Sequence, residues 1–180
     1  FYFEIKFMQQ ISVIGAGTMG NGIAHCFAQK GFNVYLIDLS SENLTNAKNT
    51  INNNLDRMVK KGIIDTQEKE LIISRIDFDT KLGEYVTNSD LVIEAATESK
   101  DIKLRIFKEL DTLCDQKTIL ASNTSSISIA EISSVTKRKE KIIGMHFMNP
   151  VPIMKLVEVI KTNKTSIDTI QKIMDLSVVL

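Results

Sequence analysis

A histidine and a glutamate stand on either side of a turn in the stretch GMHFMNPVPIMKLVEV, residues 144–159, which holds both prolines of the chain. If the flanking segments form an antiparallel hairpin centred on Pro152, His146 lies opposite Glu158, with Cβ atoms about 5 Å apart. The carboxylate would then accept a hydrogen bond from one imidazole nitrogen and leave the other nitrogen free to take a proton. The pair predicts a general base. The alternative is an ion pair that only ties two strands together.

A glycine-rich segment, GAGTMGNGIA, begins at residue 15 directly after an apolar run. Glycines in a GxGxxG pattern allow a tight turn at Gly15, close approach of a pyrophosphate at Gly17 and close strand–helix packing at Gly20. A helix that starts in this loop offers its free N–H groups to phosphates. The cofactor-binding residues expected here are Gly15, Ala16, Gly17, Thr18, Met19 and Gly20.

An aspartate ends the next apolar run, NVYLID, 18 residues after Gly20. At this distance the Asp38 carboxylate is expected to accept hydrogen bonds from the adenosine ribose hydroxyls. Its charge would repel a 2′-phosphate, and the following LSSENL holds no basic residue, so NAD is favoured over NADP. A tight turn followed by an exposed aspartate is the alternative. His25, beyond the loop, is interpreted as a packing or surface residue rather than a base.

The elements that would position these side chains alternate along the chain, without a Pro/Gly-rich linker or an internal repeat. Apolar runs predict strands at 11–15, 33–38, 75–79, 90–96, 118–123, 142–147 and 155–160. Helical periodicity predicts helices near 18–30, 41–61, 66–74, 99–115 and 126–136. Strands buried on both faces, each followed by a helix, predict a doubly wound α/β fold of the Rossmann type, with a mostly parallel sheet and an antiparallel C-terminal hairpin. Its ligands bind at the carboxyl ends of the strands.

The composition narrows the function. The chain has 180 residues, 43% of them hydrophobic, with 22 basic and 22 acidic side chains, so it offers no charged surface for nucleic acid. No apolar run approaches the roughly 18 residues of a membrane span. Cys26 and Cys114 are expected to be free thiols, which favours a cytoplasmic location. No metal is expected.

Both ends of the sequence suggest a piece of a longer protein. The chain begins at Phe1, and Met8 stands just before the first strand, so residues 1–7 are expected to be additional and 8–180 to form one domain. Near the other end, Ile167, Ile170, Ile173 and Met174 are expected to form one helical stripe. The sequence then stops without a cap residue, and a further C-terminal region is expected.

Four segments together, GAGTMGNGIA, VIEAATESKDIK, SNTSS and HFMNPVPIMKLVEVI, resemble the NAD-binding domain of the L-3-hydroxyacyl-CoA dehydrogenases, and most of all its bacterial 3-hydroxybutyryl-CoA members. The resemblance implies NAD-dependent oxidation of the 3-hydroxyl of an acyl-CoA. It makes His146 and Glu158 the catalytic pair, and Ser125 a catalytic residue that hydrogen-bonds substrate beside the nicotinamide. It also implies a homodimer when the protein is full length, with a further asparagine supplied by a C-terminal helical domain.

The same resemblance assigns supporting residues, each with a simpler alternative. Asn149, Glu98 and Lys103 would contact the cofactor near the nicotinamide, but a turn asparagine and two surface charges explain them as well. Lys61 would meet the CoA phosphates, or lie at a solvated helix end beside Lys60. The neighbours of Ser125, which are Asn123, Thr124 and Ser126, would serve the site or cap the following helix.

Two other functions remain open on the sequence alone. The chain could be a module that holds NAD without turnover. It could also be a related dehydrogenase that acts on a free hydroxy acid or sugar acid, since these enzymes share the fold and much of the glycine-rich loop.

Overall fold

A computed structural model describes residues 8–180, so the expectation that residues 1–7 are additional lies outside the described residues. The strands are β1 (Gln10–Ile14), β2 (Asn33–Ile37), β3 (Ile76–Asp79), β4 (Leu91–Glu94), β5 (Ile119–Ser122), β6 (Ile142–Phe147) and β7 (Val157–Ile160). The α-helices are α1 (Thr18–Gln29), α2 (Ser41–Lys60), α3 (Thr66–Ser74), α4 (Gly83–Thr87), α5 (Lys100–Leu113), α6 (Ile129–Ser134) and α7 (Ile167–Val179), with a 3-10 helix, η2 (Lys139–Lys141), before β6.

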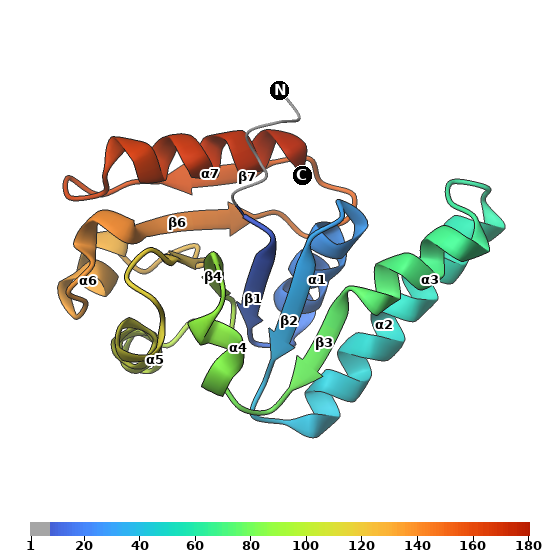
Figure 1. The fold of residues 1–180 in the computed structure, drawn as a ribbon, viewed down its shortest axis with the longest axis horizontal. Helices are drawn as coiled ribbons and strands as arrows, with labels where there is room; N and C mark the ends of the chain where they lie inside the picture. The colour runs from blue at the N-terminus through green and yellow to red at the C-terminus, as the bar shows by residue number, and fades with distance from the viewer. Residues whose placement is uncertain (1–7) are drawn as a thin grey trace.

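The strands form one seven-stranded sheet in the order β3-β2-β1-β4-β5-β6-β7 (Figure 1). Neighbours are parallel except at the β6–β7 edge, where the pairing is antiparallel. The order reverses between β1 and β4, which is the switch point where doubly wound sheets bind ligands. The predicted fold class, a mostly parallel Rossmann-type sheet with an antiparallel C-terminal hairpin, is confirmed.

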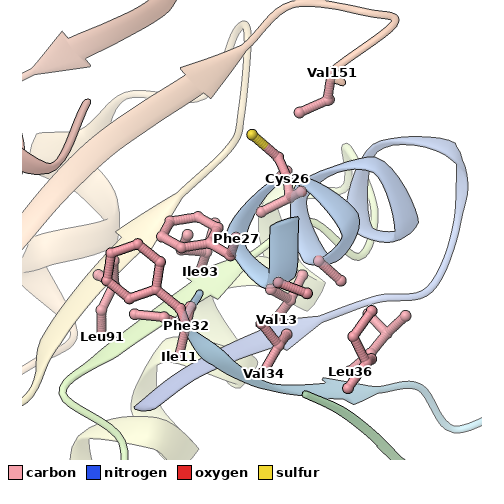
Figure 2. Packing of buried hydrophobic residues seen from close by; sticks show 14 of the residues in the cluster. Ile11, Val13, Cys26, Phe27, Phe32, Val34, Leu36, Leu91, Ile93 and Val151 are labelled. Carbon is pink, nitrogen blue, oxygen red and sulfur yellow. The ribbon is translucent and has the colours of Figure 1, made fainter. Parts of the chain in front are cut away.

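Helices cover both faces of the sheet, and two apolar clusters mark the two layers. The larger cluster joins the sheet to α1, α2, α3 and α7, which we call the α1 face. Figure 2 shows part of it, where Phe27 and Phe32 of the α1 region pack over Ile11, Leu91 and Ile93 of the strands. The second cluster joins the sheet to α4, α5 and α6, and this side we call the α5 face. The inner strands β1, β4, β5 and β6 are buried on both sides, which explains their largely apolar sequences, whereas the edge strands β3 and β7 are only partly buried.

Polar caps define where several helices begin. Ser40 accepts a hydrogen bond from Asn43 N at the start of α2, and Asp65 accepts one from Glu68 N at the start of α3. These two helices project from the sheet on the side opposite α6 and β7 (Figure 1). The expected helix at 41–61 and the one at 66–74 are therefore confirmed within one residue.

Two expectations about helices are wrong in part. In α7 the buried residues are Thr169, Ile173 and Leu176, whereas Ile167 and Met174 are 84% and 48% exposed. Thr169, Ile173 and Leu176 are spaced by four and three residues, so they lie on one face of the helix, which packs against the core. Ile167 and Met174 lie outside this face although they are apolar. The expected helix at 126–136 is reduced to α6, Ile129–Ser134. The short α4 and η2 were not predicted, because five and three residues are too few to show a period.

Cys26 and Cys114 are both buried and free, as expected. Within residues 8–180, no helix is both long and apolar enough to span a membrane.

His25 is a packing residue in the interior of α1. It is 1% exposed, and neither ring nitrogen has a hydrogen-bond partner among the described residues. Burial therefore lowers the pKa of its imidazole from 6.5 to about 4. The ring is neutral at pH 7.

Acidification should therefore destabilise the fold through His25. The unfolded chain takes the proton near pH 6.5 and the folded chain only near pH 4, so stability is unaffected above this window and falls as the pH drops through it. At about 1.4 kcal/mol per pKa unit, the loss is roughly 3 kcal/mol. Urea unfolding of the wild type and His25→Leu at pH 7 and pH 4 measures it. A difference between the two proteins that does not change with pH would contradict this assignment.

Candidate active site

The hairpin pairs the histidine and the glutamate as the sequence predicts. β6 and β7 are antiparallel with His146 opposite Glu158 and Gly144 opposite Ile160. Val157 and Val159 pack against the α1 face cluster, so the alternating Glu158 and Ile160 lie on the α5 face, together with His146. The imidazole Nδ1 lies 2.7 Å from Glu158 Oε2.

This contact sets the protonation pattern of the ring. An ionised carboxylate can only accept, so Nδ1 carries the hydrogen, and in the neutral ring the lone pair lies on Nε2. The histidine side chain is 23% exposed and the glutamate 54%, so the free nitrogen is open to a ligand. The pair can therefore take a proton from a bound hydroxyl and stabilise the resulting imidazolium.

Ser125 lines the same cavity as this pair. The cavity has a volume of about 360 Å³ and lies between α6, the segment after β5, and the hairpin. Ile129 and Ile160 provide its apolar wall, while Ser125, His146 and Glu158 contribute polar groups. The structure thus brings together all three residues predicted to be catalytic.

The glycine-rich loop connects β1 to α1 at the switch point of the sheet. Gly15 has φ +98°, and a Cβ there would lie 2.6 Å from Ala96 Cα, so the loop presses directly against the end of β4. A Cβ on Gly20 would lie 1.7 Å from the Gly15 carbonyl oxygen. Over Gly17 there is open space, since a Cβ placed there would meet no atom within 4 Å, and no side chain caps the start of α1. Open space beside uncapped N–H groups fits a pyrophosphate.

Asp38 is half-buried beside this loop rather than freely exposed. Its Oδ2 accepts a hydrogen bond from Ala16 N at 2.8 Å, and its Oδ1 accepts one from Ser40 N at 2.9 Å and one from Asn43 Nδ2 at 3.2 Å. The carboxylate is thus held against the phosphate loop, where a dinucleotide's ribose would follow the pyrophosphate. These residues fit NAD.

Glu98 organises the segment that carries Ser125. Its Oε1 accepts hydrogen bonds from Thr124 Oγ1 at 2.6 Å, Ser126 Oγ at 2.8 Å, and the N–H groups of Ser125 and Ser126 at 3.1 Å. The Ser125 hydroxyl also donates to it, at 3.3 Å. Desolvation alone would raise the pKa of Glu98, but these bonds and the charge of Lys103 outweigh it and lower the pKa to about 2.

The remaining predicted residues take different positions. Lys103 is 1% exposed, so its interpretation as a surface charge is wrong; its ammonium lies 2.7 Å from Glu94 Oε2 and 3.7 Å from Glu98 Oε2. Asn149 is exposed in the turn after β6. Lys61 follows the last residue of α2, the helix that projects away from the sheet, and the structure does not bring it to the cavity.

The neighbours of Ser125 support the segment and do not cap α6. The N-cap residue of α6 is Ser128, and its side chain makes no capping hydrogen bond. Instead Asn123 Oδ1 accepts from Phe147 N at 2.9 Å, which ties the end of β5 to the end of β6. Thr124 Oγ1 accepts from Ile127 N at 3.0 Å.

Sequence reasoning missed Glu94 as a member of this region. It is fully buried at the end of β4 and binds Lys103. A signal was available, because a glutamate inside the apolar run LVIEAA needs a partner when the strand is buried.

This chain is similar to known proteins in both sequence and fold. Residues 10–179 match the family described as 3-hydroxyacyl-CoA dehydrogenase, NAD binding domain. A 3-hydroxybutyryl-CoA dehydrogenase of Bradyrhizobium diazoefficiens is 47% identical over 154 residues, which is 86% of this chain and 52% of that protein. One from Clostridioides difficile is 45% identical over 168 residues, or 93% of this chain and 59% of that protein.

The crystal structure of (S)-3-hydroxybutyryl-CoA dehydrogenase PaaH1 from Ralstonia eutropha matches with a TM-score of 0.93 at 41% identity, over 96% of this chain and 60% of that one. The chain therefore spans little more than half the length of the curated relatives it matches first.

Proposed function

Because this chain belongs to the family of the 3-hydroxyacyl-CoA dehydrogenase NAD-binding domain, we propose that the protein oxidises (S)-3-hydroxyacyl-CoA, above all 3-hydroxybutyryl-CoA, to 3-oxoacyl-CoA and also catalyses the reverse reaction. The observation that carries this proposal is the His146–Glu158 contact of 2.7 Å, in a cavity shared with Ser125.

Each of these side chains has one task in the proposed reaction. His146 Nε2 takes the proton of the 3-hydroxyl while the C3–H bond breaks and the C3–O double bond forms. Bound NAD supplies the acceptor for the hydride. Glu158 holds the ring in position and stabilises its positive charge, and the Ser125 hydroxyl turns its one hydrogen from Glu98 to the substrate oxygen. In the reverse direction, protonated His146 returns the proton.

Cofactor and substrate contacts extend the proposal. Asp38 selects NAD through the ribose hydroxyls, and Glu98 and Asn149 meet the nicotinamide half of the cofactor. Lys103 is 1% exposed, so the direct cofactor contact expected of it is replaced by a contact with Glu98, whose carboxylate it supports from below. The proposal places Lys61 at the CoA phosphates. Since α2 has 20 residues, or roughly 30 Å, the CoA moiety would extend along this helix. The full-length protein would be a cytoplasmic homodimer, which sedimentation analysis can check.

An assay of the protein expressed from its complete gene tests the function. Acetoacetyl-CoA and NADH are mixed with the enzyme, and NADH absorbance is followed. We expect turnover that free CoA inhibits in competition with acetoacetyl-CoA. Equal turnover of free acetoacetate, insensitive to CoA, would indicate a hydroxy-acid dehydrogenase. NAD binding without any turnover would indicate a nucleotide-binding module.

A further inference from the structure

Glu94 is a fully buried carboxylate to which the reaction above gives no task. It is the last residue of β4 and faces the α5 side of the sheet, with Ser122 of β5 as its neighbour in the register. Lys103 Nζ donates to its two oxygens at 2.8 and 2.7 Å, Ser122 Oγ donates at 2.8 Å and Ala96 N at 2.9 Å. Each donor belongs to a different segment of the chain near the site.

The bond to Ala96 leads to the cofactor loop. Residues 95–96 form the wall against which Gly15 turns, and a Cβ on Gly15 would lie 2.7 Å from the Ala95 carbonyl oxygen and 2.6 Å from Ala96 Cα. There is no spare room between the two segments. By fixing the Ala96 N–H, Glu94 fixes the surface on which the phosphate loop rests.

The bonds to Ser122 and Lys103 connect Glu94 to the segment after β5 that carries Ser125. Ser122 is the last residue of β5, directly before the segment 123–126. Lys103, held by Glu94, is also 3.7 Å from Glu98, and the Glu98 carboxylate gathers the donors of Thr124, Ser125 and Ser126. The buried lysine therefore places a positive charge under the carboxylate that shapes this segment.

A buried ion pair of this kind is weak evidence for stability, because well-packed apolar residues of similar volume often stabilise a fold as much or more. Its polar groups instead fix the relative positions of the segments they join. We propose that Glu94 is a positioning residue, which sets the cofactor loop through Ala96 and the Ser125 segment through Lys103 and Glu98. The inference rests on the proposed function only in giving Ser125 a catalytic task.

The test starts with Glu94→Gln, which keeps the shape but removes the charge that holds Lys103. Two measurements follow: amide hydrogen exchange of Ser125 and Ser126 in this chain, and kcat and KM in the full-length enzyme. We expect exchange at these two amides to accelerate about 10-fold or more. We expect kcat to fall about 10- to 100-fold through misplacement of Ser125, with a smaller change in the KM for NADH.

Two further variants keep the test decisive. Glu94→Leu combined with Lys103→Met replaces the pair by apolar side chains and leaves no buried charge without its partner, so the melting temperature should lie above that of Glu94→Gln, while exchange of the two amides is still faster than in the wild type. Lys100→Met is the control. It removes the neighbouring half-exposed Lys100–Glu131 ion pair of 2.7 Å, and it should change neither the exchange of the Ser125 and Ser126 amides nor kcat. If Glu94→Gln fails to fold, the same two measurements on the variant with Glu94→Leu and Lys103→Met provide the test.

Amide exchange and kcat that stay within about twofold in the Glu94 variants would show that the pair only fills the core, and would overturn the proposal. Faster exchange at Ser125 and Ser126 in a protein whose wild type has no dehydrogenase activity would support the positioning role and reject the function. The two failures are thus distinguishable.

Discussion

Replacing His146 by alanine should lower kcat for acetoacetyl-CoA reduction by about 10²- to 10⁴-fold, the usual contribution of a general acid or base. The side chain is the one group in the cavity with a free imidazole nitrogen, since Nδ1 is engaged with Glu158 Oε2 at 2.7 Å. Alanine removes the proton carrier and leaves the glycine-rich loop untouched. Steady-state kinetics of the full-length enzyme measure the loss, and calorimetric titration with NADH should give an unchanged dissociation constant.

The other histidine of the sequence provides the matched control. His25 lies inside α1 and is 1% exposed, so His25→Gln should keep its kcat within a few-fold of the wild type. Undiminished turnover by His146→Ala would remove the base assignment. A His146 variant that also lost NADH binding would point to damage of the fold instead of the chemistry.

Substituting Gly20 with alanine should have the largest effect on cofactor binding. The new Cβ would lie 1.7 Å from the Gly15 carbonyl oxygen, so the loop or the start of α1 must move. Overpacking of this kind typically costs about 1–3 kcal/mol of stability, and more when backbone must shift. Losing one charge-assisted hydrogen bond to the pyrophosphate is worth about 1.5–3 kcal/mol, so NAD affinity should fall about 10- to 100-fold or more.

Gly17→Ala separates cofactor contact from folding. Nothing lies within 4 Å of the added methyl, and φ −67° with ψ −168° is open to alanine. The melting temperature should therefore stay unchanged, while NAD affinity falls because the methyl occupies the space that the pyrophosphate needs. Thermal unfolding and titration with NAD check both expectations. If Gly17→Ala binds NAD as tightly as the wild type, the dinucleotide does not approach this loop.

The pairing of His146 with Glu158 could be predicted from the sequence because a strand has a period of two. Once a turn is centred on Pro152, the position of every opposing residue follows, and His146 meets Glu158 as the register shows. The glycine-rich loop could be predicted because its three glycines follow an apolar strand and open a helix, and Asp38 ends the next strand; the glycine spacing alone would be weak evidence. Both are local features, in which the pattern and the geometry lie within one short segment.

Features that depend on distant packing were not predictable in the same way. The sequence shows Lys103 on a helix, but its burial follows from the placement of α5 over Glu94. The hydroxyls of the segment after β5 could equally have capped a helix, and their bonds to Glu98 depend on how two strands end side by side. In α7, the position of the helix against the sheet determines which residues are buried. The most apolar stripe does not coincide with that face, and Ile167 is exposed.

Bound NAD should bring its nicotinamide next to the His146–Glu158 pair. A crystal structure of the chain with NADH tests this most directly. We expect pyrophosphate density at the start of α1 over Gly17, ribose hydroxyls on Asp38, and a nicotinamide ring at the cavity lined by Ser125 and His146. Density for the dinucleotide at any other place, or a nicotinamide ring turned away from His146, would contradict it.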